Sequence, residues 1–508
     1  MHRTITDSNK RYLKSLLQCT IIFLFILIPP RTSAQTPVSE QTAFCIDCHA
    51  SVTPGIVADW RASRHAGITP AKALVKPDIN RRISVKTLPD SLAGFAVGCA
   101  ECHTLKPNTH ADSFEHNDFQ VHIVVTPADC ATCHPEEWTQ YQDNLMSMAH
   151  DNLKDNPLYE TLVASINGLQ HFSQGVLTVD PPLPETDDQS CYFCHGTVVE
   201  IAGMETRETD LGDMTFPVLT GWPNPGVGRV NPDDTRGSCT SCHARHEFSV
   251  AVARKPYTCS ECHKGPDVPA YKVYEVSKHG NIYSSKFKDW DFTAVPWVLG
   301  EDFTAPTCAV CHASLVTDSE GQVVSERTHR MNDRLDTRLF GLVYAHPHPE
   351  SSNTSIITNK SGLPLPTELT GEPAMEFLID SAEQAVRQAR MKKVCRSCHS
   401  QMWVDGHFDA LKRVIEETNA MTLTATRIMR QIWRESLAEG LPQGKSIFDE
   451  AIEKMWVEQW LFYANSTRFS AAMSGADYGV FADGRWAMSK NIQAMHDWLG
   501  LRQQLRNR

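Results

Sequence analysis

Hydrophobic and polar positions divide the chain into two regions of different character. From residue 35 to about residue 371, apolar residues occur in short groups between Pro, Gly and polar residues, and few windows alternate as a strand does. From about residue 372, longer stretches keep the apolar spacing of a helix and contain little Gly or Pro. The pattern therefore predicts a mainly α protein, in which a loop-rich body precedes a C-terminal bundle of long helices.

Helical patterns follow one another in the C-terminal region. They cover residues 374–394, 408–439, 451–473 and 486–499. The last helix is expected to close at Gly500, since glycine commonly ends helices.

The segment over residues 451–473 is rich in Met, Trp, Phe and Ala. Ser446, with Asp449 three positions later, predicts a capping box before it. Because the segment is apolar on more than one face, it is typical either of a buried core helix or of a helix packed against a second subunit.

The first 34 residues resemble a secretory signal. A basic stretch precedes the apolar run Leu16–Ile28, and small residues end at Ala34. The run is short for a membrane span, which needs about 20 residues, so we expect cleavage near Ala34 rather than a retained anchor. No later apolar stretch is long enough to cross a bilayer. The mature chain is therefore expected in the periplasm or another extracytoplasmic compartment, without a membrane span.

Composition narrows the class of protein. The chain has 508 residues, 41% of them hydrophobic, and a formal net charge of −12. This length is typical of one to three domains. The acidic balance argues against nucleic acid as a partner and favours basic protein partners.

Cysteine spacing carries the chemistry. Of 17 cysteines, only Cys19 lies in the leader, and all the others fall into eight Cys-x-x-Cys-His motifs. The motifs, numbered first to eighth below, are Cys45-Cys48-His49, Cys99-Cys102-His103, Cys130-Cys133-His134, Cys191-Cys194-His195, Cys239-Cys242-His243, Cys259-Cys262-His263, Cys308-Cys311-His312 and Cys395-Cys398-His399.

This spacing predicts eight covalently attached c-type haems. Two thiols three positions apart bond the porphyrin edge, and the adjacent histidine binds the iron. A disulfide framework or a set of zinc sites does not require a histidine after every second cysteine. Export agrees with haem, since c-type attachment takes place outside the cytoplasm.

Fourteen of the 22 histidines lie outside the motifs, and low-spin haems usually take one as second ligand. The candidates are His65, His122, His150, His246, His279, His329, His346, His348 and His407. Of the pair His346 and His348 one suffices, and we select His348. Surface positions are expected for His2, His110, His116 and His496, while His171 is undecided.

The regions follow from the motifs. We expect a signal at 1–34, a three-haem region at 35–190, a region with the catalytic and further electron-transfer haems at 191–371, and a helical region with the last motif at 372–508. If all eight irons carry two ligands, the protein is an electron conductor, and if one keeps an open position it is an enzyme. Motif spacing alone does not decide between these.

Longer segments resemble the octahaem hydroxylamine oxidoreductase family from about Phe44 to Trp486. They begin at Cys191 (CYFCHGT), Gly221 (GWPNPGVGRVNPD), Cys242 (CHARHEFS), Lys264 (KGPD), Glu275 (EVSKHG), Thr328 (THRMNDRL), Tyr344 (YAHPHP), Asp405 (DGHF) and Asn465 (NSTR), the last running on through Asp477-Tyr-Gly.

The resemblance implies seven bis-histidine haems and a five-coordinate catalytic haem on His195. In oxidising members, a tyrosine of a neighbouring subunit is bonded to that porphyrin, which implies a homotrimer. Tyr478 matches that residue and Tyr463 is the second choice, whereas position alone favours an ordinary loop tyrosine. A small c-type cytochrome is the implied electron acceptor.

The implied pocket departs from the family at one position. Members commonly carry Asp-His where this chain has Asp267-Val268, so Asp267 remains to accept protons but Val268 does not relay them. Tyr344 is a further pocket candidate. The resemblance implies oxidation of hydroxylamine to nitric oxide or nitrite. Hydrazine dehydrogenation, nitrite or hydroxylamine reduction, and non-catalytic electron transfer stay open as alternatives.

Overall fold

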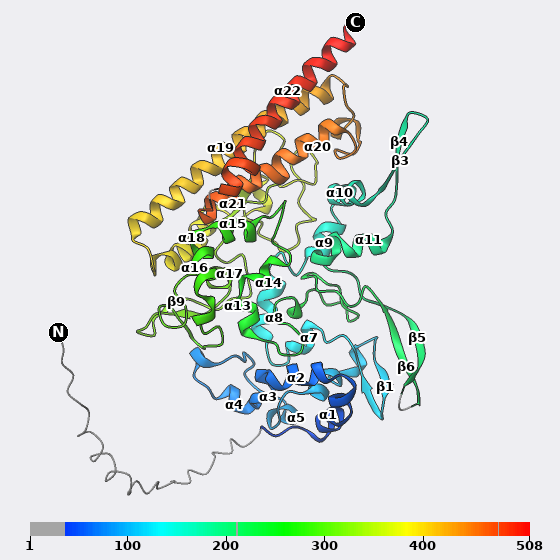
Figure 1. The fold of residues 1–508 in the computed structure, drawn as a ribbon, viewed down its shortest axis with the longest axis vertical. Coiled ribbons are helices and arrows are strands. Elements are labelled where there is room, and N and C mark those ends of the chain that lie inside the picture. The colour runs from blue at the N-terminus through cyan, green and yellow to red at the C-terminus, as the bar shows by residue number, and fades with distance from the viewer. Residues whose placement is uncertain (1–35, 210–211, 476) are drawn as a thin grey trace, which may run out of the picture.

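The computed structural model describes residues 36–209, 212–475 and 477–508, with the side chains at 442 and 477–480 left out. The predicted signal therefore lies outside the described residues. The chain builds a lower body of short helices and loops and an upper bundle of long helices (Figure 1). This arrangement confirms the mainly α class and the order of the two regions.

The body contains many short helices joined by loops. The helices up to the fourth motif are α1 (Glu40–Val52), α2 (Pro54–Ala62), α3 (Arg64–Gly67), α4 (Pro70–Leu74), α5 (Asp90–Ala93), α6 (Cys99–His103), α7 (Pro127–Cys130), α8 (Pro135–Gln142), α9 (Ala149–Lys154), α10 (Pro157–Asn167), α11 (Pro184–Gln189) and α12 (Cys191–His195). Those that follow are α13 (Val250–Arg254), α14 (Pro256–Ser260), α15 (Ala270–Val276), α16 (Lys278–Lys286) and α17 (Cys308–His312).

Strands occur only in small sheets within the described residues. Antiparallel pairs join β1 (Phe114–His116) to β2 (Phe119–Val121), β3 (Leu169–Ser173) to β4 (Val176–Asp180), β5 (Glu200–Thr209) to β6 (Gly212–Thr220), and β10 (Thr337–Arg338) to β11 (His346–Pro347). A three-stranded sheet joins β7 (Trp297–Val298), β8 (Val316–Thr317) and β9 (Val323–Ser325). Two of the hairpins, β3–β4 and β5–β6, project from the body (Figure 1).

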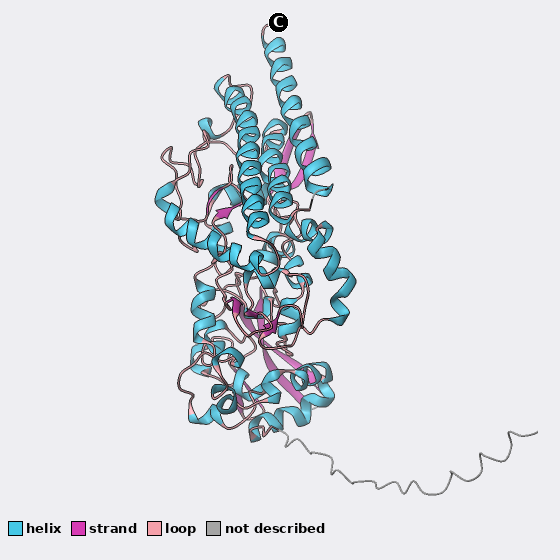
Figure 2. Cartoon of the chain, turned by 90° about the vertical axis from the view of Figure 1, so that its left-hand side faces the viewer, coloured by secondary structure: helices cyan, strands magenta, loops and turns pink. Residues whose placement is uncertain are grey.

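The C-terminal bundle consists of α18 (Ser381–Arg396), α19 (Gln401–Arg434), α20 (Ala451–Glu458), α21 (Ala464–Met473) and α22 (Ala487–Arg506). A π-helical turn, Gln459–Tyr463, joins α20 to α21, and a second one, Asp477–Trp486, leads into α22. At 34 residues, α19 is about 51 Å long. The long helices lie side by side in both views (Figures 1 and 2).

Apolar side chains from α19, α20, the first π turn and α22 form the bundle core. Trp433, Trp456 and Trp460 stand at its centre, each at most 2% exposed. Of the two alternatives for residues 451–473, the structure therefore supports the buried core helix.

Several helix boundaries differ from the sequence pattern, and α19 spans Gln401–Arg434 where the pattern covered 408–439. The first helix starts at Ser381 rather than Ala374, because Asp380 caps it by accepting a hydrogen bond from the Glu383 backbone N–H. The capping residues before α20 are Glu450 and Glu453, not Ser446 and Asp449.

The last helix continues through Gly500 to Arg506. A glycine inside a helix costs only about 1 kcal/mol relative to alanine. Beyond it, Gln503 Nε2 donates to Glu435 Oε2 at 2.9 Å, which attaches the final turns to the end of α19. No helix within the described ranges combines the length and the apolarity needed to cross a bilayer.

Candidate haem sites and the fourth motif

Motif residues converge because of helical spacing. The second, fourth and seventh motifs are the short helices α6, α12 and α17, and the eighth begins at the end of α18. Positions i, i+3 and i+4 share one face of a helix, so both thiols and the imidazole of Cys-x-x-Cys-His point the same way. The second, fourth and seventh motifs, and the first motif within α1, therefore each offer two attachment points and one iron ligand on a single side.

A continuous cavity of about 2710 Å³ runs through the body, lined by residues of all eight motifs. Sites for ordinary small ligands measure roughly 300–1,000 Å³. The described apolar cores lie in the bundle and around Trp297, whereas the motifs surround this cavity. The donor set and the space fit c-type haems, which would fill the centre of the body.

Cysteines of different motifs touch one another and so order the motifs in space. Thiols lie within hydrogen-bonding reach in the pairs Cys45–Cys99, Cys130–Cys239, Cys194–Cys262 and Cys259–Cys308. Three further pairs interact electrostatically without a hydrogen bond: Cys102 with Cys130, Cys242 with Cys259, and Cys311 with Cys395. The order is therefore first, second, third, fifth, sixth, seventh, eighth, with the fourth motif branching from the sixth.

Five motif histidines face a second imidazole from a distant part of the chain. The distances between ring centres are 6.2 Å for His49–His116, 6.4 Å for His103–His246, 6.4 Å for His134–His65, 6.5 Å for His243–His329 and 6.1 Å for His399–His279. Metal–imidazole bonds of about 2 Å on opposite sides of one ion give a ring-centre distance of roughly 6 Å. The pairs are thus spaced as two axial ligands of one iron.

Backbone carbonyls fix the orientation of several motif rings. His103 Nδ1 lies 2.7 Å from the carbonyl oxygen of His122, and His195 Nδ1 lies 3.0 Å from that of Ala149. An Nδ1–H that donates to a carbonyl leaves Nε2 free for a metal, a common arrangement around ligating histidines. Burial lowers the pKa of His312 and of His329 to about 4, so both rings present a neutral lone pair.

Two expected distal ligands lie beside the Nδ1 edge of their nearest motif histidine. The ring centre of His122 is also 6.0 Å from that of His103, but the His122 carbonyl accepts from His103 Nδ1, on the edge of the ring opposite the one that would bind iron. His150 directly follows Ala149, whose carbonyl occupies the Nδ1 side of His195, and its own Nδ1 faces Asp151 Oδ1 at 2.9 Å. Local sequence does not reveal on which side of a ring a neighbour lies.

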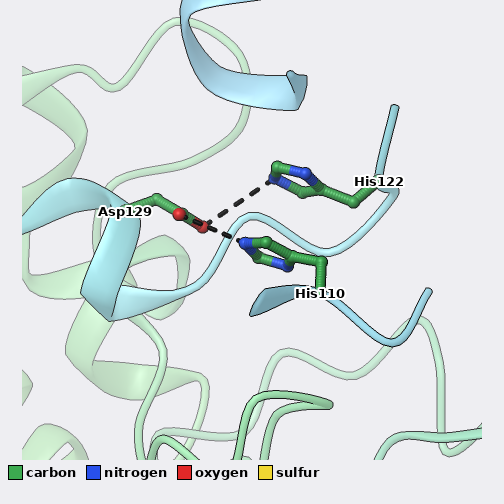
Figure 3. A group of neighbouring side chains, drawn as sticks. All are labelled: His110, His122 and Asp129. Atoms are coloured by element: carbon green, nitrogen blue, oxygen red, sulfur yellow. Dashed lines mark hydrogen bonds and ion pairs between the residues drawn. The ribbon is translucent and has the colours of Figure 1, made fainter. Parts of the chain in front are cut away.

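Two histidines expected on the surface are not there. His116, on the hairpin β1–β2, is half-buried and faces His49, a position that sequence reasoning missed. His110 is buried, stacked on His122 beside Asp129 (Figure 3). His171 is exposed on β3 and pairs with Asp180 at 2.9 Å.

The fourth motif is held by a close backbone approach behind it. Gly196 has a φ of +99°, and a Cβ there would lie 2.3 Å from the Arg229 nitrogen. Only glycine fits both the conformation and the space. Arg229 is buried against Trp222, with its guanidinium 4.9 Å from the ring centre. The segment 221–233 therefore fixes the position of His195.

Charged and polar groups gather near His195. Asp267 and Arg338 both interact electrostatically with the His195 ring, and Tyr159 interacts with both of them. All line the same cavity. His346 also lines it, and its buried Nε2 has no hydrogen-bond partner. The carbonyl of Asp267 is held by Asn465 Nδ2 at 3.0 Å.

The expected tyrosines are placed differently. Tyr344 lies in the bundle core rather than along the cavity, and its hydroxyl donates to the carbonyl of Leu369 at 3.1 Å. Burial raises its pKa to about 12. Tyr463 donates to Glu458 Oε2 at 2.8 Å. The side chain of Tyr478 lies outside the described residues.

Comparisons with known proteins agree with the cavity. Residues 231–333 match the family model described as "Seven times multi-haem cytochrome CxxCH". A solved structure titled "Hypothetical multiheme protein" is 39% identical, has a TM-score of 0.87, and the match covers 94% of this chain and 98% of that chain. Similarity therefore extends along nearly the whole described length.

Two relatives come from Kuenenia stuttgartiensis. A "Probable nitrite reductase-hydroxylamine oxidoreductase fusion protein" is 25% identical over 443 residues, which is 83% of this chain and 41% of the relative, so this chain spans less than half of that protein. A reducing HAO-like protein complex is 19% identical with a TM-score of 0.58, covering 92% of this chain and 86% of that chain, which shows a shared fold. The chain belongs to the multihaem c-type cytochromes.

Proposed function

We propose that this protein is an extracytoplasmic oxidoreductase that oxidises hydroxylamine at the fourth motif and carries the electrons through seven further c-type haems. The observation that carries the proposal is which motif histidines face a second imidazole and which do not. Five motif histidines face one at 6.1–6.5 Å. Of the remaining three, His195 has two charged side chains beside its ring, Asp267 and Arg338, in addition to His150.

The count of ligands leaves one iron open. His65, His116, His246, His279 and His329 serve five motifs. We assign His348 and His407 to the sixth and seventh motifs by elimination. Both line the cavity and each has a backbone carbonyl as ring partner, and His407 also lies near His399 of the eighth motif. Seven second ligands for eight motifs leave His195 without one, and His346 stays as a pocket residue.

Bound at the fourth motif, haem supplies an open iron position that binds a small nitrogen compound and accepts electrons. Asp267 takes a proton from the N–H or O–H of the substrate, the role of a positioned carboxylate. Asn465 holds the backbone of Asp267 and thereby its position. With Val268 in place of the usual histidine, Asp267 acts without a second proton relay on that side.

The contacts between cysteines support one route for electrons. The fourth motif touches the sixth through Cys194 and Cys262, and the sixth touches the seventh through Cys259 and Cys308. The fifth motif is reached through Cys242 and Cys259. Electrons thus leave toward both ends of the row, where a small c-type cytochrome accepts them.

The proposal includes a homotrimer in which Tyr478 of one subunit is bonded to the haem of the next. Support comes from the hairpin β3–β4, which precedes the fourth motif and exposes at least 50% of each of its large apolar side chains. They are Leu169, Phe172, Val176, Leu177 and Val179. Contiguous apolar surface of this kind marks protein interfaces.

Spectra of the haem-loaded protein test the proposal. We expect a high-spin signal from one haem in electron paramagnetic resonance, and a change in the dithionite-reduced optical spectrum on adding hydroxylamine or hydrazine. Turnover with hydroxylamine should reduce an added cytochrome c faster than turnover with hydrazine. If every haem is low-spin and unresponsive to cyanide and nitric oxide, the protein is an electron conductor instead.

A second candidate is reduction of nitrite at the same site, favoured by Arg338. This side chain is near His195, and its guanidinium suits an anion better than neutral hydroxylamine. The similar proteins include a reducing HAO-like complex and a probable nitrite reductase-hydroxylamine oxidoreductase fusion protein. A reducing enzyme lacks the tyrosine bond, so absence of the optical band of a cross-linked ferrous haem selects this candidate.

A further inference from the structure

A buried cluster of two imidazoles and two carboxylates lies outside the haem ligand set. It comprises His110, His122, Asp112 and Asp129, on the segment between the second and third motifs. All four side chains are at most 5% exposed. The rings of His110 and His122 are stacked, with centres 3.6 Å apart and planes 2° apart, beside Asp129 (Figure 3).

Two Nε2 atoms converge on one carboxylate. His110 Nε2 lies 3.2 Å from Asp129 Oδ1, and His122 Nε2 lies 3.9 Å from Asp129 Oδ2. Donors bound to one tetrahedral zinc ion at about 2.0–2.1 Å are separated by roughly 3.4 Å. The observed separations lie on either side of this value, and the three donor atoms all lie within 4.8 Å of one another. Because the rings are parallel, binding one ion requires them to tilt so that both in-plane Nε2 lone pairs meet it.

Several polar atoms of the cluster have no hydrogen-bond partner. They are both ring nitrogens of His122, Nδ1 of His110 and Oδ1 of Asp112. Buried polar atoms are nearly always satisfied, and each exception requires an explanation. A cation held by the two Nε2 atoms and Asp129 satisfies His122 Nε2, which lies 3.9 Å from Asp129 Oδ2, beyond hydrogen-bond distance.

Asp112 occupies the position of an outer carboxylate. Its Oδ2 accepts from the backbone N–H of Ile123 at 2.9 Å and of Val124 at 2.8 Å, and its free Oδ1 lies 3.6 Å from His110 Nδ1. A metal-ligating histidine usually donates its other N–H to a carboxylate. Asp129 is fixed likewise, since its Oδ2 accepts from the backbone N–H of Thr126 at 2.8 Å.

Charge balance agrees with a divalent ion. Burying carboxylates is costly unless they are paired or bind a metal. One dication held by two neutral imidazoles balances both Asp112 and Asp129. We propose that His110, His122 and Asp129 bind a divalent transition-metal ion of the zinc class, with Asp112 orienting His110.

Zinc titration of the haem-loaded protein tests this site. The protein is stripped with EDTA, which leaves covalent haem in place, and titrated calorimetrically with Zn²⁺. We expect one tight site, weakened at least about 100-fold in His110→Gln and in His122→Gln. Asp112→Asn should weaken binding about 10–100-fold, the usual cost of losing an outer partner.

The matched control is His171→Gln, which removes a histidine from a solvent-exposed pair with Asp180. It should leave the tight site unchanged. Three outcomes overturn the proposal and leave a His–Asp network only. They are absence of tight zinc binding in the wild type, wild-type affinity in both His110→Gln and His122→Gln, and loss of the site in His171→Gln.

X-ray absorption at the zinc edge decides the matter if the variants fail to acquire haem. Two imidazoles and one carboxylate at about 2.0–2.1 Å support the site. One imidazole or none overturns it.

Discussion

His103 and His246 face each other across 6.4 Å, while the other side of the His103 ring is occupied by the His122 carbonyl, 2.7 Å from Nδ1. The two nitrogen-bearing edges of this imidazole thus have different partners. His122 is nearer in sequence to His103, but its carbonyl occupies the Nδ1 edge, so we assign His246 to the Nε2 side. We therefore expect His246, and not His122, to be the second ligand at the second motif, and single substitutions of the two residues test this.

Replacing His246 by Ala should convert one low-spin haem to high-spin, since the iron at the second motif loses its second ligand. His122→Ala should leave all haem spin states unchanged, because its carbonyl remains. Electron paramagnetic resonance of both proteins measures this. A new high-spin signal in His122→Ala but not in His246→Ala would contradict the assignment.

Asp267→Asn should lower kcat for hydroxylamine oxidation by about 100-fold or more, because a general base contributes about 10²–10⁴. The haem spectra should not change, since the backbone contact to Asn465 remains. Asp188→Asn, another carboxylate just before the fourth motif, serves as control and should retain activity. Equal rates in Asp267→Asn and wild type would exclude Asp267 as the base.

Arg338→Gln should raise KM for nitrite about tenfold, because a charge-assisted hydrogen bond contributes about 1.5–3 kcal/mol and tenfold equals about 1.4 kcal/mol. KM for neutral hydroxylamine should change far less. Arg330→Gln is the control. The Arg330 guanidinium forms an ion pair with Asp143, with 2.6 Å between Nη2 and Oδ2, and this pair lies outside the proposed pocket. Equal effects of Arg338→Gln on both substrates would show that Arg338 does not recognise the anion.

Phe172→Glu should dissociate the proposed trimer, since it places a charge on the apolar hairpin β3–β4, where Phe172 is 75% exposed. Light scattering coupled to gel filtration measures the mass. Val75→Glu, an exposed apolar position after α4, should keep the mass of wild type. A trimer that survives Phe172→Glu and further charges on the hairpin would exclude this surface as the interface.

Glu453 gives a pH dependence of stability. Burial raises its pKa to about 8, so between the unfolded value of 4.5 and about 8 the unfolded chain releases a proton that the folded protein retains. Folding stability should therefore fall as pH rises through this window, by at most about 1.4 kcal/mol per pH unit from this group.

Glu453→Gln should remove that loss and should be relatively more stable at pH 8 than at pH 5. The Gln side chain still accepts from Trp433 Nε1, which bonds Glu453 Oε1 at 2.9 Å in the wild type. Thermal unfolding at several pH values measures the difference. A constant difference across the window would mean that Glu453 is ionised in the folded protein.

The sites of covalent haem attachment can be predicted from local sequence alone. Cysteine, cysteine and histidine at i, i+3 and i+4 share one helical face whatever the rest of the chain does, so motif positions and the helical C-terminal region were predictable. Apolar periodicity likewise predicted α19 and the segment 451–473. Helix ends were less predictable, because caps such as Asp380 and tertiary contacts such as Gln503–Glu435 decide them.

Only the tertiary structure decided which second imidazole faces which motif. The partners of His49 and His399 lie 67 and 120 positions away, and no local rule connects residues at such separations. Folding around the cavity brings His116 to His49 and stacks His122, which also lines the cavity, on His110. Ligand pairing is a long-range property because two rings must meet across one iron, whereas covalent attachment needs only one turn of helix.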